Sequence, residues 1–342
     1  MKGGWIDAHY VYDAEWISDP TFLYPIQLAM FFVPLGILDL YDAFVLWDWL
    51  SQTLLLLAVL LLLPLFGGAR KHYVLPIALG ILLYRPSIPL LFNGQLSAFF
   101  LLIIILVGGF WEKEHWIWGG MLASLLFLKP NLGGPILVLL GLYLVIQKKF
   151  RGILGIGLGT VILLIIGWVY DPDWVGTYLH VLQSKHSLTF GLSATVWGLS
   201  ALICDFKLYP TLIIGSIIVL LVLILYFLLL TKVKEITPLT GVAISISTAL
   251  LVTPYLWPYD QVLLFLPIIL IMAILKNSGF PYLGTVMVFI GIDIAAWILF
   301  GISARRGMEN LNALLSVIVF GLQAFLLFRN GCNLGVETER SI

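Results

Sequence analysis

Long apolar runs alternate along the chain with short breaks that carry charges, prolines or glycines. A helix that crosses a bilayer needs about 20 apolar residues, and a sliding reading of hydropathy marks such helices. We predict about 11 or 12 hydrophobic helices on this basis. The predicted segments are Tyr24–Leu38, Ala43–Leu65, Tyr73–Leu91, Leu96–Phe110, Trp116–Leu128, Pro135–Ile146, Ile153–Tyr170, Tyr209–Leu230, Pro238–Thr253, Gln261–Leu275, Pro281–Gly301 and Leu311–Phe328.

The composition places these helices in a membrane. Of the 342 residues, 61% are hydrophobic and only 11% are charged, and the mean hydropathy is +1.07. A soluble domain has about 45–50% apolar and about 25% charged residues. We therefore predict an all-α, polytopic integral membrane protein. It has a single domain over residues 1–342 and ends in a polar tail at residues 329–342, and its sequence shows no internal repeat.

Charge is sparse, balanced and concentrated in every second loop. The formal net charge is zero, so the chain has no long-range attraction for nucleic acid. The positive-inside rule assigns the basic loops to the cytoplasm; they carry Arg70, Lys71, Lys113, Lys148, Lys149, Arg151, Lys232, Lys234 and Lys276. The opposite loops then face outward: Asn93–Gln95, Lys129–Asn131, Asp171–Leu208, Thr253–Asp260 and Ser303–Asn310, of which the last is an exception because it carries Arg305 and Arg306.

The beginning of the chain does not fit this alternation. A full crossing by Tyr24–Leu38 would place residues 1–23 in the cytoplasm, but the segment is short and contains Pro25 and Pro34. We expect it to lie in or re-enter the outer leaflet instead. Residues 1–23 are then an external loop, and because they lack the apolar core of a secretory signal, we expect that a first helix is missing from this sequence.

Lys129 interrupts two apolar runs in the stretch SLLFLKPNLGGPILVLL. A lysine at a helix end can simply extend its charge to the membrane surface. Pro130 indicates that the helix ends there, and Asn131 with the two glycines after it would leave backbone donors beside the cation. Because lysine is an ordinary phosphate ligand, the alternative is an anion site.

The stretch FNGQ places Asn93 and Gln95 at the outer end of the next span. Their amides can orient sugar hydroxyls or phosphate oxygens, or cap the helix that begins near Leu96. Arg85, next to Pro86, is a second candidate cation, with a plain anchoring role as its alternative.

The stretch TPYLWPYDQ gathers Tyr255, Trp257, Tyr259 and Asp260 in one short outer loop. Aromatic residues at this depth form the usual interfacial belt, but their rings can also line a sugar site. Asp260 can pair with Lys129 or Arg85, or bind a hydroxyl.

Two further features are singled out by position. The long outer connection has Trp174, Tyr178 and Val181 at helical spacing, which predicts an amphipathic surface helix, either a plain interfacial helix or a cap over the site with His186 after it. No metal-ligand pattern surrounds its histidines, so we predict no zinc. Asp293 lies inside a predicted span, where an acid is costly; we expect it to be buried and protonated, or paired with Asn or Ser.

Taken in order, the stretches IDAHY, FLYPIQLAMFFVPLGIL, NGQLSAFFLLIIIL, LLFLKPNLGGPILVLL and LLVTPYLWPYDQVLLFLP resemble the polytopic glycosyltransferases of the GT-C fold, specifically glycosyltransferase family 87. The resemblance runs from about Asp7 to Leu275. It departs from the family pattern at Tyr24, where the family often has Tyr-Pro-Pro and this chain has Tyr-Pro-Ile.

This resemblance implies a chemistry. Members of the family use polyprenyl-phosphate mannose, and an acidic residue in their first external loop serves as general base. The matching residue here is Asp7 of the DAHY stretch, which also contains Tyr10, and Asp13 is the alternative; a solvated acidic loop is the plainer reading. A glycosyl phosphate needs a base for the acceptor hydroxyl and a cation for the departing phosphate, and we assign the latter role to Lys129.

We therefore expect a membrane enzyme that moves a hexose, mannose first, from a polyprenyl-phosphate sugar to a lipid or glycan acceptor, with inversion, at the outer face of the cell's inner (plasma) membrane. No cofactor and no metal is expected. The orienting groups are Asn93, Gln95 and the 255–260 loop. The alternatives are a secondary transporter, which would show paired inverted halves and charges at the membrane midplane, and a non-catalytic lipid-handling protein.

Overall fold

The computed structural model of the chain describes residues 24–184, 189–233, 236–306 and 308–330. These residues form helices and contain no strand, as the all-α prediction requires. Six helical stretches within them are long and apolar enough to cross a membrane, and five shorter apolar helices lie among these: Ile26–Ile37, Ser97–Glu112, Trp116–Leu128, Pro130–Ile146 and Pro238–Val252.

The chain begins with a short α2 (Ile26–Phe32) and a 3₁₀ turn η1 (Val33–Ile37). Together they are too short to cross a bilayer, in line with the predicted non-crossing segment. Gln27 ties α2 to α9 (Phe150–Tyr170), because its Nε2 donates to the Leu163 carbonyl at 2.9 Å. The segment therefore lies against the half of α9 that ends at Tyr170.

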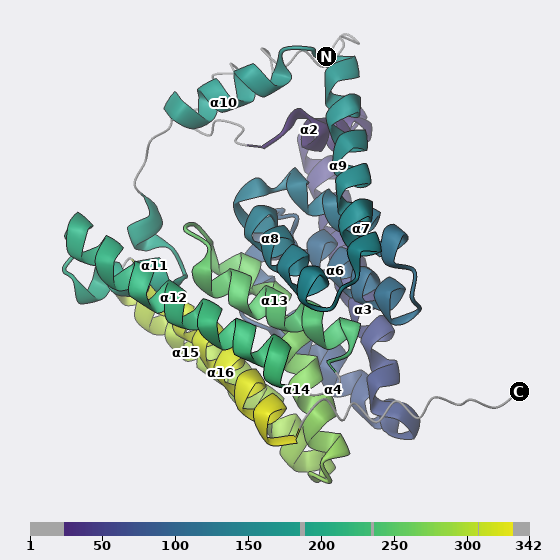
Figure 1. Cartoon of the computed structure of the whole chain (residues 1–342), viewed down its shortest axis with the longest axis vertical. Helices are drawn as coiled ribbons and strands as arrows, with labels where there is room; N and C mark the ends of the chain where they lie inside the picture. Colours follow the sequence, from purple (N-terminus) through teal and green to yellow (C-terminus); the bar gives the residue numbers. More distant parts are fainter. Residues whose placement is uncertain (1–23, 185–188, 234–235, 307, 331–342) are drawn as a thin grey trace, which may run out of the picture.

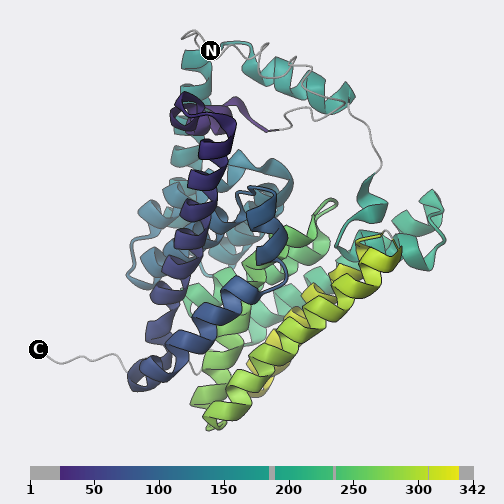
Figure 2. The same cartoon turned by 180° about the vertical axis from the view of Figure 1, so that it is seen from behind.

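A helical hairpin follows. Helix α3 (Leu40–Leu62) continues through η2 (Leu63–Ala69) and turns back as α4 (Arg70–Leu83), so that the two helices lie side by side (Figure 2). The reversal occurs at Gly67, whose φ of 53° and ψ of −135° is a conformation that only glycine adopts readily.

Helices α13 (Pro238–Val252) and α14 (Phe265–Asn277) form the centre of the bundle (Figure 1). In the span that contains α14, 89% of the residues of its apolar stretch are buried. The share is 17% in α12 (Leu208–Lys232), 22% in α9 and 28% in α15 (Tyr282–Arg306). The exposed apolar side chains of these outer helices, such as Ile213, Leu220 and Ile298, are the surface expected to face lipid.

Other helices pack around this centre. They are α6 (Ser97–Glu112), α7 (Trp116–Ala123), which continues as η3 (Ser124–Leu128), α8 (Pro130–Ile146) and α16 (Ala313–Asn330). Helices α12, α15 and α16 run alongside one another (Figures 1 and 2). Smaller elements, α5 (Ser87–Phe92), α10 (Trp174–Ser184), η4 (Thr189–Leu192), α11 (Val196–Ile203) and η6 (Asn310–Asn312), complete the fold.

Helices α7 and α9 cross with almost no space between their backbones. A Cβ atom on Gly120 would lie 2.2 Å from the carbonyl oxygen of Gly152, and one on Gly155 would lie 2.2 Å from that of Ile117. Small residues permit such crossings in membrane proteins. The crossing fixes η3, which leads directly to Lys129.

Helices break repeatedly at one end of the bundle. Helix α4 ends before Pro86, η3 ends before Pro130, and η5 (Pro258–Leu264) precedes α14. Proline supplies no N–H and its ring blocks helix continuation, so it accounts for each break. Irregular backbone at membrane depth is tolerated where protein surrounds it, and these breaks bring polar side chains together.

The predicted segments agree closely with the helices, with three corrections. The predicted segment Tyr73–Leu91 is divided into α4 and α5, because the chain leaves the helix at Tyr84, before Pro86. The helix after Lys129 begins at Pro130 rather than Pro135, since a proline is tolerated in the first turn. Helix α11 was not predicted; it is short and flanked by polar loops. The expected amphipathic helix is present as α10.

Candidate active site

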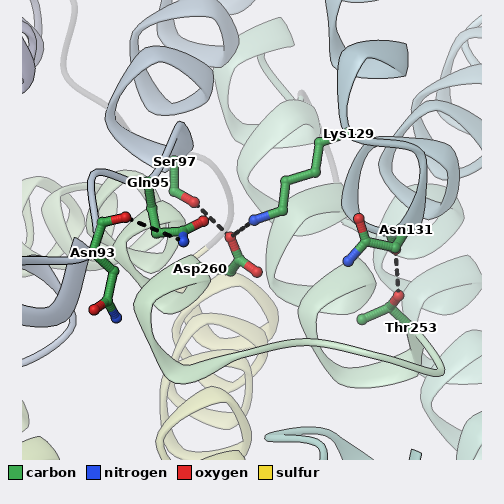
Figure 3. Close-up of polar contacts among 7 residues, drawn as sticks. All are labelled: Asn93, Gln95, Ser97, Lys129, Asn131, Thr253 and Asp260. Atoms are coloured by element: carbon green, nitrogen blue, oxygen red, sulfur yellow. Dashed lines mark hydrogen bonds and ion pairs between the residues drawn. The ribbon is translucent and has the colours of Figure 1, made fainter. Parts of the chain in front are cut away.

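The centre of the site is a buried ion pair between Lys129 and Asp260 (Figure 3). The Lys129 ammonium lies 2.6 Å from Oδ1 of Asp260, and the two side chains are 2% and 0% exposed. Ser97, in the first turn of α6, donates its hydroxyl to the same carboxylate oxygen. The loop that precedes α8, the start of α6 and η5 therefore meet at one carboxylate.

One face of this pair is aromatic and one carboxylate oxygen is unused. The Lys129 nitrogen lies 4.9 Å from the centre of the Tyr259 ring, which is a cation–π distance. Oδ2 of Asp260 is buried and has no hydrogen-bond partner within the described part of the chain. A buried polar atom without a partner is costly, so this oxygen marks a position where a ligand hydroxyl would be stabilised.

The backbone around Lys129 is set by Pro130, which occupies the first position of α8. The N–H groups of Leu132 and Gly133 donate to the Lys129 carbonyl at 3.1 and 2.7 Å. The prediction that these glycines leave free donors beside the cation is therefore wrong for Gly133. That glycine serves packing instead, because a Cβ there would lie 1.8 Å from the Leu126 carbonyl oxygen.

Asn131 connects this turn to the 253–260 loop. Its carbonyl accepts a hydrogen bond from the Thr253 hydroxyl at 2.8 Å (Figure 3). Ala194 donates to the Leu256 carbonyl at 3.0 Å, which ties the same loop to the segment before α11. The loop that carries Tyr259 and Asp260 is thus held from two sides.

Tyr24 lies near the site, because the charge of Asp260 acts on its phenol. Burial, with smaller contributions from Asp260, Tyr255 and Tyr178, raises the pKa of its phenol to about 12. The phenol therefore stays protonated at neutral pH and remains a hydrogen-bond donor. Tyr24 and Tyr178 come from segments far apart in the sequence, and both lie at the Asp260 end of the bundle.

A polar cavity of about 220 Å³ lies next to the ion pair, with Tyr259 in its wall. Its lining also contains Arg85, Asn93, Trp257 and Glu309. The Arg85 guanidinium stacks on the Phe300 ring at 3.6 Å. The Arg85 backbone N–H donates to Asp293 at 3.2 Å.

This second contact explains Asp293. The sequence led us to expect a carboxyl that is buried and protonated, or paired with Asn or Ser. Asp293 is half-buried, and it accepts from the backbone N–H that the break between α4 and α5 leaves without a helical partner. Its role in the described structure is to hold that break, and with it Arg85.

The capping role that the sequence allows for Asn93 and Gln95 is not seen, and their role as orienting groups stays a prediction. Gln95 donates to the Asn93 carbonyl at 3.5 Å, and neither side chain caps α6, whose first turn has no side-chain cap. The Asn93 side chain is exposed and turns away from Lys129 (Figure 3). The turn is held by Gly94, with φ of 59°, and by Trp47, whose indole donates to the Gly94 carbonyl at 2.9 Å.

A separate, apolar cavity has a volume of about 280 Å³. It lies between α2, η3, α8, α9 and α10, and its wall includes Leu128 and Pro130, the two neighbours of Lys129 in sequence. Leu164 on α9 and Trp174 on α10 form other parts of the wall. The wall of this cavity offers an apolar surface to a hydrocarbon chain.

The sequence model of glycosyltransferase family 87 matches residues 22–254, well over half of the chain. The chain belongs to glycosyltransferase family 87. It is therefore a membrane glycosyltransferase, an enzyme that transfers a sugar from a donor to an acceptor. The alternatives of a secondary transporter and of a non-catalytic lipid-handling protein fall with this result. No curated protein and no solved structure matches the chain.

The predicted site residues of this glycosyltransferase divide into three groups. Lys129, Asn131, Tyr24, Tyr259 and Asp260 lie together at the ion pair. In the second group, Arg85, Asn93 and Trp257 line the adjacent cavity, while Gln95 contacts Asn93 and Tyr255 contacts Trp257. The remaining ones, Asp7, Tyr10, Asp13 and His186, lie outside the described residues.

Sequence reasoning missed two residues of the candidate site: Ser97, which contacts Asp260, and Glu309, which lines the polar cavity. Ser97 is a hydroxyl at the very start of a fully apolar helix, and Glu309 is the acid in the outer loop before α16. Both are polar residues at the predicted outer end of a span, a signal that could have selected them. Among the described residues, no three His, Cys, Asp or Glu side chains gather to hold a metal ion.

Proposed function

We propose that this glycosyltransferase moves a hexose, mannose first, from a polyprenyl phosphate to a lipid or glycan acceptor at the extracytoplasmic face of the cell's inner membrane. The observation that carries the proposal is the position of Lys129. Its two neighbours in the sequence, Leu128 and Pro130, line an apolar cavity, and Tyr259, whose ring lies 4.9 Å from its ammonium, lines a polar one. A lipid-linked phosphate has the same division into an apolar tail and an anionic head.

Lys129 is suited to hold the leaving phosphate even though it is already paired. A lysine ammonium carries three N–H donors, and Asp260 uses one of them at 2.6 Å. The others remain for phosphate oxygens. Asp260 positions the ammonium and supplies its counter-charge in a buried setting, where an unpaired charge would be costly.

The transfer itself needs few groups. The acceptor hydroxyl loses its proton to a carboxylate, its oxygen forms a bond to the anomeric carbon, and the bond between that carbon and the phosphate oxygen breaks. Polyprenyl phosphate then leaves with the electron pair, stabilised by Lys129. A single displacement of this kind inverts the anomeric centre. From the family resemblance we assign the base to Asp7, with Asp13 as the alternative.

The orientation follows from the placement of charge. The basic loops lie together at one end of the bundle. Lys276 lies near Gly67, which is in the turn before Arg70. Glu112, next to Lys113, accepts a hydrogen bond from the backbone of Leu239, which follows the loop with Lys232. The ion pair lies at the other end, with the 253–260 loop. The positive-inside rule then supports a cytoplasmic location for the first end and an external one for the site.

The direct test is transfer of radiolabelled mannose from polyprenyl-phosphate mannose by the full-length protein in native-lipid membranes, with polyprenyl-phosphate glucose in parallel. We expect label in extractable lipid or insoluble glycan with the wild type, and at least a hundredfold less with Lys129→Ala. Lys113→Ala, an exposed lysine at the opposite end, is the matched control. Absence of label from both donors with the folded wild type would overturn the proposal.

A further inference from the structure

The polar cavity beside the ion pair holds two opposite charges that do not satisfy each other. Arg85 is only 8% exposed. Within the described part of the chain, neither its Nη1 nor Oε2 of Glu309 has a hydrogen-bond partner. Both residues line the same cavity of about 220 Å³. A buried donor and a buried acceptor thus face one space without partners, at a cost that a ligand would remove.

The charges around the cavity indicate the type of ligand. An anion would be attracted by Arg85 but repelled by the carboxylate of Glu309. A cation would be attracted by Glu309 but repelled by Arg85. The two charges affect each other: the pKa of the Arg85 guanidinium is lowered by burial and raised by Glu309. A neutral molecule with several hydroxyls can accept from Arg85 and donate to Glu309 at once.

The residues that line the cavity favour a sugar ring among neutral ligands with several hydroxyls. Trp257 and Tyr259 give the cavity aromatic surface, and the electron-rich face of an aromatic ring attracts the polarised C–H groups of a pyranose. The exposed amide of Asn93 is at the rim. The volume lies below the roughly 300–1,000 Å³ of pockets for drug-sized molecules, which fits one ring rather than an extended ligand.

Tyr259 links this cavity to the ion pair. Its ring lies 4.9 Å from the Lys129 nitrogen and also forms part of the cavity wall. The next residue, Asp260, carries the carboxylate that holds Lys129. A ring bound between Arg85 and Glu309 would therefore lie beside the place proposed for the phosphate.

We propose that Arg85, Glu309 and Trp257 form the acceptor subsite, and that the acceptor presents a neutral sugar ring to it. The acceptor is then a glycan or a glycolipid rather than an unglycosylated lipid or a protein side chain. This inference rests on the proposed function for the word acceptor; the binding of a neutral sugar ring can be tested without it.

The test is ¹⁹F NMR of the full-length protein in lipid nanodiscs with 5-fluorotryptophan at its 12 tryptophans. The Trp257 resonance is assigned by its loss in Trp257→Phe. The probes are methyl α-D-mannoside, methyl α-D-glucoside, methyl α-D-galactoside and inorganic phosphate. We expect at least one glycoside to shift the Trp257 resonance saturably, with affinity about tenfold weaker in Glu309→Gln and in Arg85→Gln.

Arg306→Gln is the matched control, because Arg306 is exposed at the end of α15 and does not line the cavity; its glycoside affinity should equal that of the wild type. A shift with phosphate but with no glycoside would make the cavity an anion site. A lack of any glycoside shift, or shifts equally strong in both variants, would also overturn the subsite.

Mannose transfer, measured on the same samples, separates the two proposals. If the glycosides bind as expected and no donor sugar is transferred, the sugar-binding cavity stands and the proposed function fails. If transfer occurs while Glu309→Gln changes neither glycoside affinity nor the KM for acceptor, the proposed function stands and the subsite fails.

Discussion

The Lys129 ammonium and Oδ1 of Asp260 are 2.6 Å apart, although 131 residues separate them in sequence, and both side chains are almost completely buried. Pairs of this kind contribute little net stability, but removing one partner strands a charge and costs about 3–5 kcal/mol. The pair therefore lets structural and catalytic effects be separated.

Lys129→Met should destabilise the protein by about 3–5 kcal/mol, because Asp260 loses its counter-charge. Lys129→Met combined with Asp260→Asn should recover most of that stability, since no charge is left unpaired. Sugar transfer should stay at least a hundredfold below wild type in both. Thermal unfolding in nanodiscs and the labelled-mannose assay measure the two effects. Recovery of transfer in the double variant would show that Lys129 has only a structural role.

The base assignment predicts that Asp7→Asn lowers kcat by about 10²–10⁴-fold with little change in the KM for donor, because only proton removal is affected. Asp19→Asn, another acid of the same external stretch, is the control and should leave kcat unchanged. A large loss in Asp13→Asn with normal activity in Asp7→Asn would transfer the role to Asp13.

The apolar cavity predicts a dependence on the length of the donor lipid. Leu164→Trp fills part of the wall on α9, so the KM for a long polyprenyl donor should rise about tenfold, equivalent to about two buried methylene groups. A short-chain donor that does not reach the cavity should be unaffected. Leu158→Trp, on the exposed surface of the same helix, is the comparison. Equal effects on both donors would place the tail elsewhere.

Membrane orientation can be measured directly. In a background where Cys204 and Cys332 are replaced by serine, Pro254→Cys should react with an impermeant maleimide added outside intact cells, because Pro254 is exposed in the loop of the ion pair. Lys113→Cys, at the other end, should react only after permeabilisation. The reverse pattern would place the site in the cytoplasm and exclude the proposed face.

Sugar binding in the polar cavity should weaken in acid. Burial raises the pKa of the Glu309 carboxyl above its ordinary 4.5, and the Arg85 charge partly opposes this. The ionised carboxylate is the acceptor, so affinity is full above this pKa and falls as pH decreases through it. Tyr255 and Tyr259 also face Glu309, but they stay neutral in this range.

Arg85→Gln removes the charge that lowers the pKa of Glu309. The pH midpoint of glycoside binding should therefore move measurably upward, and the affinity should also fall. Glycoside titration followed by the Trp257 resonance at several pH values measures both. A midpoint that is unchanged by Arg85→Gln would mean that Glu309 does not control the binding.

The sequence predicted most helices because the alternation between apolar runs and polar breaks is strong. Pro86 and Pro130 also mark the breaks at the site. The pairing of Lys129 with Asp260 was one of several options, since both were expected in outer loops but nothing in the pattern orders helices around the bundle. Helices that face lipid are apolar on all sides and carry little information about their neighbours.

Glu309 shows the same limit from the other direction. Its partner across the cavity, Arg85, is 224 residues away in sequence, and the two meet only because α15 and α4 lie side by side, with Asp293 joined to the Arg85 backbone. Such a contact depends on lateral packing, for which a single sequence has no periodic signal. Ser97 was missed for a different reason: a single serine at a helix start is too common to stand out.

The glycine crossing between α7 and α9 makes the donor side of the site sensitive to a residue that never touches a substrate. Lys129 follows η3 directly, and η3 continues α7. The position of the ammonium therefore depends on the contact of Gly120 with Gly155. One methyl group added at that contact must push the two helices apart. The spacing between the cation and the apolar cavity, which α9 also lines, is thus encoded in the absence of two side chains.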